Sequence, residues 1–531
     1  MGLHIRKKKN KSGTISIQII DRTHRNYKVI ETIACVNNEK DEQLYIEIAN
    51  KRLEELRKKF YPTLFDTDNS NNELKFISLC NKDLIPVGDE LIYGTLFSKI
   101  GCENIPLKFK KYKLFKALVI SRLLYPGSKL YLIDYLDYFK KEDIDKNQIY
   151  RFLDTLYQEE IKTTVEECIF NHTLKIMNNT IKVTFYDVTT LYFESESEDD
   201  LRRIGFSKEG KLARPQILLG LFTTLEGYPL SYEVYEGNKY EGHTLIDILK
   251  KFQKRFKLKT KPIVVADRGM LNNDNIAYLE NNGYKYILAY KIKNISNTLK
   301  EQISNLTFIN DETIHTIDIN KDITYKDNND KKQTLNIKQK LILTYSTKRA
   351  KKDKRTREKA IEKINSALNK KNITKSDLKL SYYAKYLDID DKCSIKYKLN
   401  PNKVSLDEKL DGIKGFATND FSLRPDDVIA HYQNQYDVEK AFRISKTDLR
   451  IRPIYHRLET RIKAHILVSF VSYAVFKEFE RRLKQKGIKF DFSQKLLRDI
   501  IKHMFALKVN GTLLHLQFDK VQQIVYDIVH T

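Results

Sequence analysis

Residues 182–193, KVTFYDVTTLYF, decide the fold of this chain. Their β-branched and aromatic side chains are typical of a β-strand, and their near-continuous apolar character favours burial. Asp187 interrupts the run at its centre. A carboxylate is costly to bury unless a cation or hydrogen bonds compensate it, so this strand has a chemical feature that packing alone does not explain.

The residues that follow predict a particular order of elements. Two more strands are expected at 215–223 and 230–235, then an amphipathic helix at 244–256. A short apolar strand at 261–266 comes next and ends at Asp267. Strand, strand, strand, helix, strand is the order of an RNase H-like core. We therefore predict an α/β fold, with this core interrupted by an insertion and flanked by helical regions.

The rest of the chain divides by composition. Residues 1–11 predict a flexible basic arm or a frayed terminus, and a small β-plus-helix module follows them. The helical pattern at 84–178 suits either a DNA-reading helix-turn-helix or a helical hairpin that only packs. The predicted domains are the arm and module at 1–62, a helical DNA-binding candidate at 84–178, the first part of the core at 179–294, a strand-rich insertion at 295–410, a return segment at 411–446 and a helical region at 447–531.

The charge indicates the class of partner, and the cysteines indicate the compartment. The formal net charge is +25, from 95 Lys and Arg against 70 Asp and Glu. This excess suits nucleic acid or an acidic membrane surface, although a lysine-biased proteome would also produce it. The 5 cysteines form no CxxC pair and indicate a reducing compartment. With no secretory signal and no long apolar run, we expect a cytoplasmic protein without a membrane partner, nucleoid-associated when DNA-bound.

A third acidic residue of interest stands in residues 422–446, which predict one long helix. Glu439 lies on the same helical stripe as Tyr432 and Lys446, each seven residues away, and the stripe is otherwise mostly apolar. Pairing of Glu439 with Lys446 or Arg443 is the simplest explanation. A site shared with the two aspartates is the sharper one.

Three carboxylates from separate segments point to divalent cations. Asp187 and Asp267 on adjacent buried strands would repel each other unless a cation lay between them, and Glu439 would complete an oxygen-rich site suited to Mg²⁺ or Mn²⁺. Two such ions promote in-line displacement at a phosphodiester. This chemistry agrees with a basic, DNA-binding chain.

The chain resembles bacterial insertion-sequence DDE transposases, from the branch with a Tyr-x2-Arg-x3-Glu-x6-Lys signature. The similarity covers roughly residues 85–480 and includes FYDVTTLYFE around Asp187 and VVADRGM around Asp267. Gln435 departs from the pattern, because the signature has Arg there, and Arg443 is placed to compensate. The signature positions in this sequence are Tyr432, Gln435, Glu439 and Lys446.

The resemblance implies a mechanism and partners. Asp187, Asp267 and Glu439 would coordinate two Mg²⁺, for which Mn²⁺ can substitute. Water would cut at a transposon end, and the freed 3′-hydroxyl would then attack a second strand. Double-stranded DNA, as transposon ends and target, is the implied partner, bound by a homodimer. The alternatives are a silent DNA-binding descendant of such an enzyme and an RNase H-like nuclease that does not join strands. The residues implied to contact DNA are Tyr432, Gln435, Arg443 and Lys446.

Overall fold

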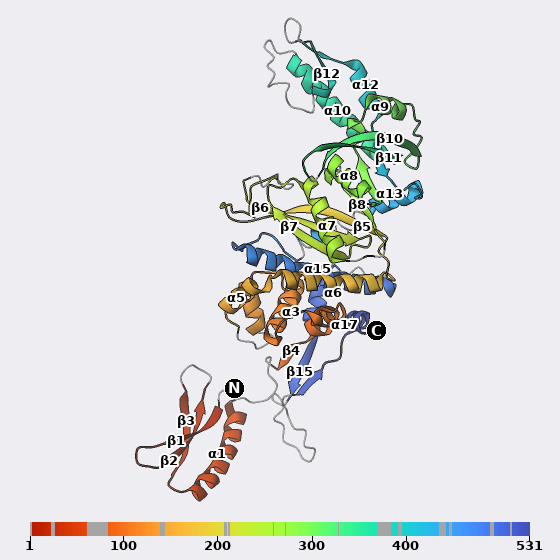
Figure 1. Cartoon of the computed structure of the whole chain (residues 1–531). Helices are drawn as coiled ribbons and strands as arrows, with labels where there is room; N and C mark the ends of the chain where they lie inside the picture. Colours follow the sequence, from red (N-terminus) through yellow and green to blue (C-terminus); the bar gives the residue numbers. More distant parts are fainter. Residues whose placement is uncertain are drawn as a thin grey trace. The chain divides into compact units, whose positions relative to one another are not determined.

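The computed structural model describes residues 3–22, 27–60, 83–137, 144–206, 210, 213–256, 258, 260–270, 272–327, 329–368, 384–390, 396–434, 442–444, 446, 449–488, 493–509 and 512–531 (Figure 1). The chain forms two compact units. One contains Met1–Leu84 and Lys508–Leu514, and the other contains Ile85–Leu507 and His515–Thr531.

The first unit contains a three-stranded antiparallel sheet covered by one helix. Ile19 on the middle strand and Leu53 on the helix are buried in one apolar cluster, so the helix packs on the sheet. The strands and the helix predicted for this module are confirmed. Its elements are β1 (Leu3–Lys9), β2 (Ile15–Asp21), β3 (Lys28–Val36) and α1 (Glu39–Phe60), with the strands in the order β1-β2-β3.

The flexible arm predicted at the N-terminus is wrong for residues 3–9, which form β1 and pair with β2 along the whole strand. The cause is a short apolar alternation that the lysines conceal. Leu3 is buried in the core of the module and Ile5 packs against that core. Lys7 Nζ lies 2.7 Å from Glu42 Oε1 on α1, which ties the basic stretch to the helix.

The second unit is organised around one eight-stranded sheet, and five of its strands have the RNase H-like topology. The three strands of a meander are antiparallel, and two parallel strands follow, each reached through a helix. The predicted RNase H-like core is thus confirmed. Its elements are β5 (Val183–Tyr192), β6 (Gln216–Thr224), β7 (Pro229–Glu236), α7 (Thr244–Arg255), β8 (Ile263–Ala266), α8 (Asn273–Asn281) and β9 (Tyr286–Tyr290), with the strands in the order β7-β6-β5-β8-β9.

The remaining three strands extend the same sheet beyond β9. β14 pairs antiparallel with β9, β11 with β14 and β10 with β11, so the strand-rich segment adds to the core sheet (Figure 1). Between β11 and β14 the chain forms a basic helix and a small hairpin. The elements are α9 (Asn297–Ser304), β10 (Ile314–Lys326), β11 (Lys332–Tyr345), α10 (Thr347–Leu368), β12 (Leu387–Asp390), β13 (Lys396–Leu399), α12 (Pro401–Lys409) and β14 (Ile413–Thr418).

Helices cover both faces of the core strands. Successive side chains of a strand point to opposite faces, and here the side chains on both faces are apolar and pack against helices. Tyr186 and Val264 belong to the apolar cluster that includes α7 and α8. Phe185 directly precedes Tyr186, and Val265 directly follows Val264. Both belong to the cluster that includes α3 and α15, on the opposite face of the sheet. The strands that carry Asp187 and Asp267 are therefore buried on both sides, as their sequences predict.

The face of the sheet that carries Phe185 and Val265 is covered mainly by α15, whose residues from Ile462 to Phe479 are almost all buried. A helix that is apolar on every side belongs in a protein core. Among the described residues, no helix combines the length and apolarity needed to cross a membrane. The covering helix is α15 (Glu459–Gln485), and further elements of the second unit are β4 (Leu84–Pro86), α2 (Thr95–Lys99), α3 (Phe109–Leu124), α4 (Lys129–Tyr135), α5 (Lys146–Leu156), α6 (Glu159–Ile176), α16 (Gln494–Lys502), β15 (Phe505–Val509) and α17 (Lys520–His530). Strand β16 (Thr512–His515) belongs mainly to the first unit.

Candidate active site

Two aspartates lie at neighbouring positions of the central parallel strands, Asp187 within β5 and Asp267 directly after β8. The register pairs Tyr186 on β5 with Ala266, the last residue of β8, and Asp187 and Asp267 are the residues that follow them in the sequence. Neighbouring strands lie about 4.8 Å apart, so the two carboxylates leave the backbone at adjacent positions. By the alternation of β5, Asp187 belongs to the face that carries Phe185 and is covered by α15.

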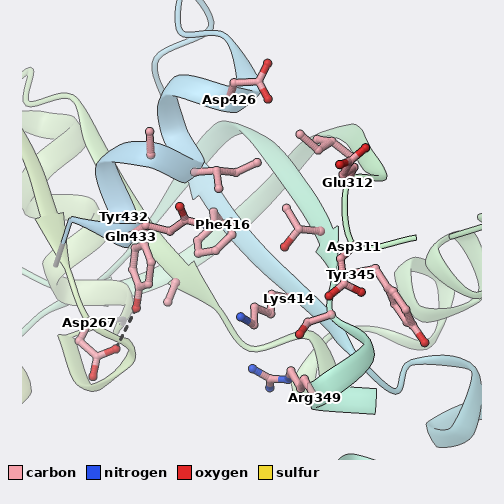
Figure 2. Close-up of a pocket in the computed structure, with 16 residues that line it drawn as sticks. Asp267, Asp311, Glu312, Tyr345, Arg349, Lys414, Phe416, Asp426, Tyr432 and Gln433 are labelled. Carbon is pink, nitrogen blue, oxygen red and sulfur yellow. Dashed lines mark hydrogen bonds between the residues drawn. The ribbon is translucent and has the colours of Figure 1, made fainter. Parts of the chain in front are cut away.

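Local hydrogen bonds orient both carboxylates. The backbone N–H of Val188 donates to Oδ1 of Asp187 at 2.7 Å. The hydroxyl of Tyr432 donates to Oδ1 of Asp267 at 3.1 Å (Figure 2). The ring of Tyr432 packs against Phe416 on β14, with 4.8 Å between centroids, so the hydroxyl is held by packing as well as by the hydrogen bond. The structure thus brings Tyr432 to one of the two predicted acids.

Tyr432 reaches Asp267 from α13 (Pro425–Gln433), which begins with Pro425 at its first turn. Asp426 and Asp427 in that turn suit the positive end of the helix dipole. The helix predicted over 422–446 is confirmed for this first part.

The rest of the predicted signature is only partly described. Gln435 and Glu439 lie outside the described residues. Arg443 is exposed and Lys446 is half-buried. Phe442 is buried and lines a small apolar space together with Leu221, which is the strand partner of Asp187. Among the described residues there is no group of three or more metal-ligating side chains, a search that does not include Glu439.

A cavity of about 960 Å³ opens beside Asp267, and we refer to it as the Asp267 cavity. Figure 2 shows Lys414 and Arg349 with their nitrogens toward the side on which Asp267 lies. Lys414 comes from β14 and Arg349 from α10, so the strand-rich segment supplies the cations. The charged residues that line the cavity are Asp267, Asp311, Glu312, Arg349, Lys414 and Asp426.

Sequence reasoning missed both cations of this cavity, although it noted the segments that hold them. Lys414 alternates with the buried residues Ile413 and Gly415 on β14, and this period-2 pattern could have placed its side chain on one face. Arg349 belongs to the basic run at 348–359, and its Nε lies 3.4 Å from Oδ2 of Asp353. No sequence pattern singles it out among its basic neighbours.

The chain's topology defines a protein with an RNase H-like core. The family model described as "Transposase DDE domain" matches residues 178–475, which is more than half of the 531 residues. The chain belongs to this family and is a transposase by that membership. The resemblance identified from the sequence motifs is confirmed.

Solved transposase structures share a more distant likeness. The piggyBac transposase synaptic complex with hairpin DNA is 10% identical, with a TM-score of 0.37, over 78% of this chain and 76% of that one. The Mos1 transposase paired-end complex with the left transposon end is 12% identical, with a TM-score of 0.15, over 44% of this chain and 66% of that one. No curated protein matches the sequence significantly. The family assignment depends on the sequence match, since TM-scores below 0.5 do not define a shared fold.

Proposed function

We propose that this protein is an insertion-sequence transposase that cuts DNA at terminal inverted repeats and transfers the freed strand. The observation that supports this most directly is the register of β5 and β8, which sets Asp187 and Asp267 on adjacent strands in a chain of the transposase DDE family. Water would attack the scissile phosphorus, and the 3′-oxygen would leave with a proton as a hydroxyl. That hydroxyl would then attack a second phosphodiester, with release of its 3′-oxygen.

The two aspartates fit a divalent-cation site by their chemistry. They supply hard oxygen ligands, of the kind that Mg²⁺ prefers, from adjacent strands of the sheet. Two bound Mg²⁺ or Mn²⁺ ions would activate the attacking oxygen and stabilise the leaving oxygen. Glu439 is the proposed third ligand, since it precedes Phe442 by three residues and Phe442 is buried beside the strand partner of Asp187.

The remaining signature residues have proposed roles in positioning. Tyr432 orients the Asp267 carboxylate through its hydroxyl. Lys446 and Arg443 would neutralise phosphates near the cut, and Gln435 would supply an uncharged hydrogen bond where the signature has Arg. A transposase must bring two DNA ends together, so we expect a homodimer on DNA. Light scattering of the DNA complex would measure that state.

Asp267→Asn tests the proposed function. The substrate is duplex DNA that carries the inverted repeat flanking the reading frame, with Mg²⁺ present. We expect cleavage, measured on denaturing gels, to fall by roughly 10³-fold or more, because an essential ligand is lost, while DNA binding persists. Asp426→Asn is the matched control, since Asp426 is exposed and lines the same cavity, and it should cut as the native protein does.

The same assay separates the alternatives. A native protein that binds the repeat and leaves it uncut would be a silent DNA-binding protein. Cutting without end specificity, and without joined products in a strand-transfer assay, would indicate a nuclease. Undiminished cleavage by the Asp267→Asn protein would refute the assignment of the site.

A further inference from the structure

A second cavity, of about 540 Å³, has a lining of the opposite charge to the Asp267 cavity and shares no residue with it. Three arginines and two histidines line it, and none of its described lining residues is acidic. Pockets of this volume are common for ligands the size of a nucleotide. We call it the arginine pocket, and the residues on which its function would depend are Arg122, Arg450, Arg452, Tyr455, His456 and His465.

A buried frame fixes the backbone of this pocket. Arg122 is 5% exposed, and its Nη1 donates to the carbonyl oxygens of Leu449 and Arg450 at 3.3 Å each. Its Nη2 lies 3.2 Å from Nδ1 of His465, whose Nε2 lies 2.9 Å from the carbonyl oxygen of Ile451. An imidazole protonated at Nε2 satisfies both contacts. Burial lowers the pKa of Arg122 to about 10, so the guanidinium stays cationic at neutral pH.

The frame holds Arg450 in an uncommon backbone conformation. Its φ is 46°, in the left-handed region that side chains with a Cβ rarely adopt. Such conformations persist only where surrounding contacts impose them, and they concentrate at functional sites. One contact that holds the backbone here is the hydrogen bond from Arg122 to the carbonyl oxygen of Arg450 itself. The exposed Arg450 side chain is thereby presented at the pocket.

The arginine pocket is attached to the strand that carries Asp187. The backbone N–H of Ile454 donates to the carbonyl oxygen of Tyr192 at 3.2 Å, and the guanidinium of Arg452 lies 5.6 Å from the centroid of the Tyr192 ring. Tyr192 is five residues beyond Asp187 on β5, which corresponds to roughly 17 Å. That span equals about five nucleotides of B-form rise.

Aromatic groups accompany the cations. The Tyr455 side chain is 74% exposed beside the arginines, and the rings of Tyr150 and His456 meet edge-to-face with 6.3 Å between centroids. Guanidinium groups bind phosphates, and an exposed aromatic ring stacks with any base. A pocket that offers both, with no carboxylate among its described lining residues, matches a nucleotide within a DNA strand.

We propose that the arginine pocket binds one nucleotide of the DNA strand that reaches the active site, with Arg450 and Arg452 on its phosphates and Tyr455 against its base. This deepens the proposed function and rests on it. Arg122 and His465 are positioning residues, because they hold the backbone that carries Arg450 and Arg452.

Fluorescence anisotropy measures this contact without cleavage when EDTA replaces Mg²⁺. The probe is a 30-nucleotide mixed-sequence DNA, single-stranded or as its duplex, titrated at several salt concentrations. Arg452→Gln should lower the slope of log affinity against log salt by about one, because one phosphate contact is lost. Tyr455→Ala should weaken single-strand binding roughly five-fold or more and leave the slope unchanged. Arg450→Gln is a second charge variant that leaves the Arg452–Tyr192 contact intact.

Arg52→Gln is the matched control, since Arg52 is already paired with Glu31 at 3.0 Å and Glu55 at 2.7 Å, and it should leave the slope unchanged. Native slopes in both Arg450→Gln and Arg452→Gln, with thermal unfolding also native, would overturn the proposal. A competition with inorganic phosphate gives a second test. If phosphate binds the native protein but not the arginine variants, and displaces no DNA, the pocket is a site for free anions only and the proposal is overturned. A native protein that binds no DNA would instead overturn the proposed function.

Discussion

The two cavities of the second unit have opposite electrostatic designs. Four carboxylates and two cations line the Asp267 cavity, whereas the arginine pocket has three guanidinium groups and no acid among its described lining residues. The Asp267 cavity would repel phosphates unless bound cations neutralised it, whereas the arginine pocket would attract them without any metal. The difference predicts that the two activities proposed for this chain, DNA binding and DNA cutting, can be separated. The predictions below test that separation, from the largest expected effect to the smallest.

Replacing the other strand aspartate should affect cutting alone. Asp187→Asn removes a charged ligand while keeping the side-chain shape, so cleavage of the repeat DNA in Mg²⁺ should fall by roughly 10³-fold or more. Affinity in EDTA should be unchanged. Asp318→Asn, an exposed aspartate on β10 of the same sheet, is the control and should retain cleavage. A parallel loss of affinity and cleavage in Asp187→Asn would show that the two properties are not separable.

The frame of the arginine pocket should be important for folding stability. Arg122→Gln leaves the carbonyl oxygens of Leu449 and Arg450 without their buried donor, so the free energy of unfolding should fall by about 2–3 kcal/mol. Urea unfolding measures it. Arg52→Gln, on an exposed helix, should change stability far less, because solvent screens exposed ion pairs. Equal stability of the two variants would mean that the frame contributes nothing beyond a surface ion pair.

The hydroxyl that joins α13 to Asp267 should have an intermediate effect. Tyr432→Phe keeps the ring packing on Phe416 and loses only the 3.1 Å hydrogen bond, so single-turnover cleavage should fall about ten-fold. Tyr325→Phe on β10, which loses a hydroxyl contact with Asn281, should cleave normally. An unchanged rate in Tyr432→Phe would show that the orientation of Asp267 does not depend on this contact.

The smallest effect is expected at the outer edge of the Asp267 cavity. Hydrogen bonds from the Thr347 side chain and backbone at the start of α10 lower the pKa of Asp311. A carboxyl whose pKa is lowered in the folded state stabilises the fold at pH values above its ordinary pKa of 3.8. This contribution is lost as the pH falls through the lowered folded-state pKa. Asp311→Asn should therefore melt slightly below the native protein at pH 7, and the difference should vanish in acid. A difference that persists in acid would have another origin.

The strands of the core could be predicted because their composition is locally decisive. Residues 182–193 are apolar and β-branched, and β5 occupies nearly the same range. The strand at residues 3–9 could not be predicted in this way, since a run of lysines conceals the alternation of Leu3 and Ile5. In such a strand the partner strand, rather than local composition, decides the structure.

The same distinction applies to the sites. Asp187 and Asp267 stand out in the sequence because acids are rare in buried strands, and Tyr432 was found through its spacing in the signature. The arginine pocket was not found, since Arg122 and His465 are 343 residues apart and only the tertiary fold joins them. Each of them alone reads as an ordinary helical residue.

Strand β14 has a mechanical consequence. Its backbone ladders join β9 on one side and β11 on the other, so β10 and β11 are not a lobe on a flexible tether. Any force that a bound partner exerts on these outer strands is transmitted as sheet twist, through β9 to β8 and the loop that holds Asp267. Hydrogen exchange should accordingly show β14 and β9 opening together rather than one after the other.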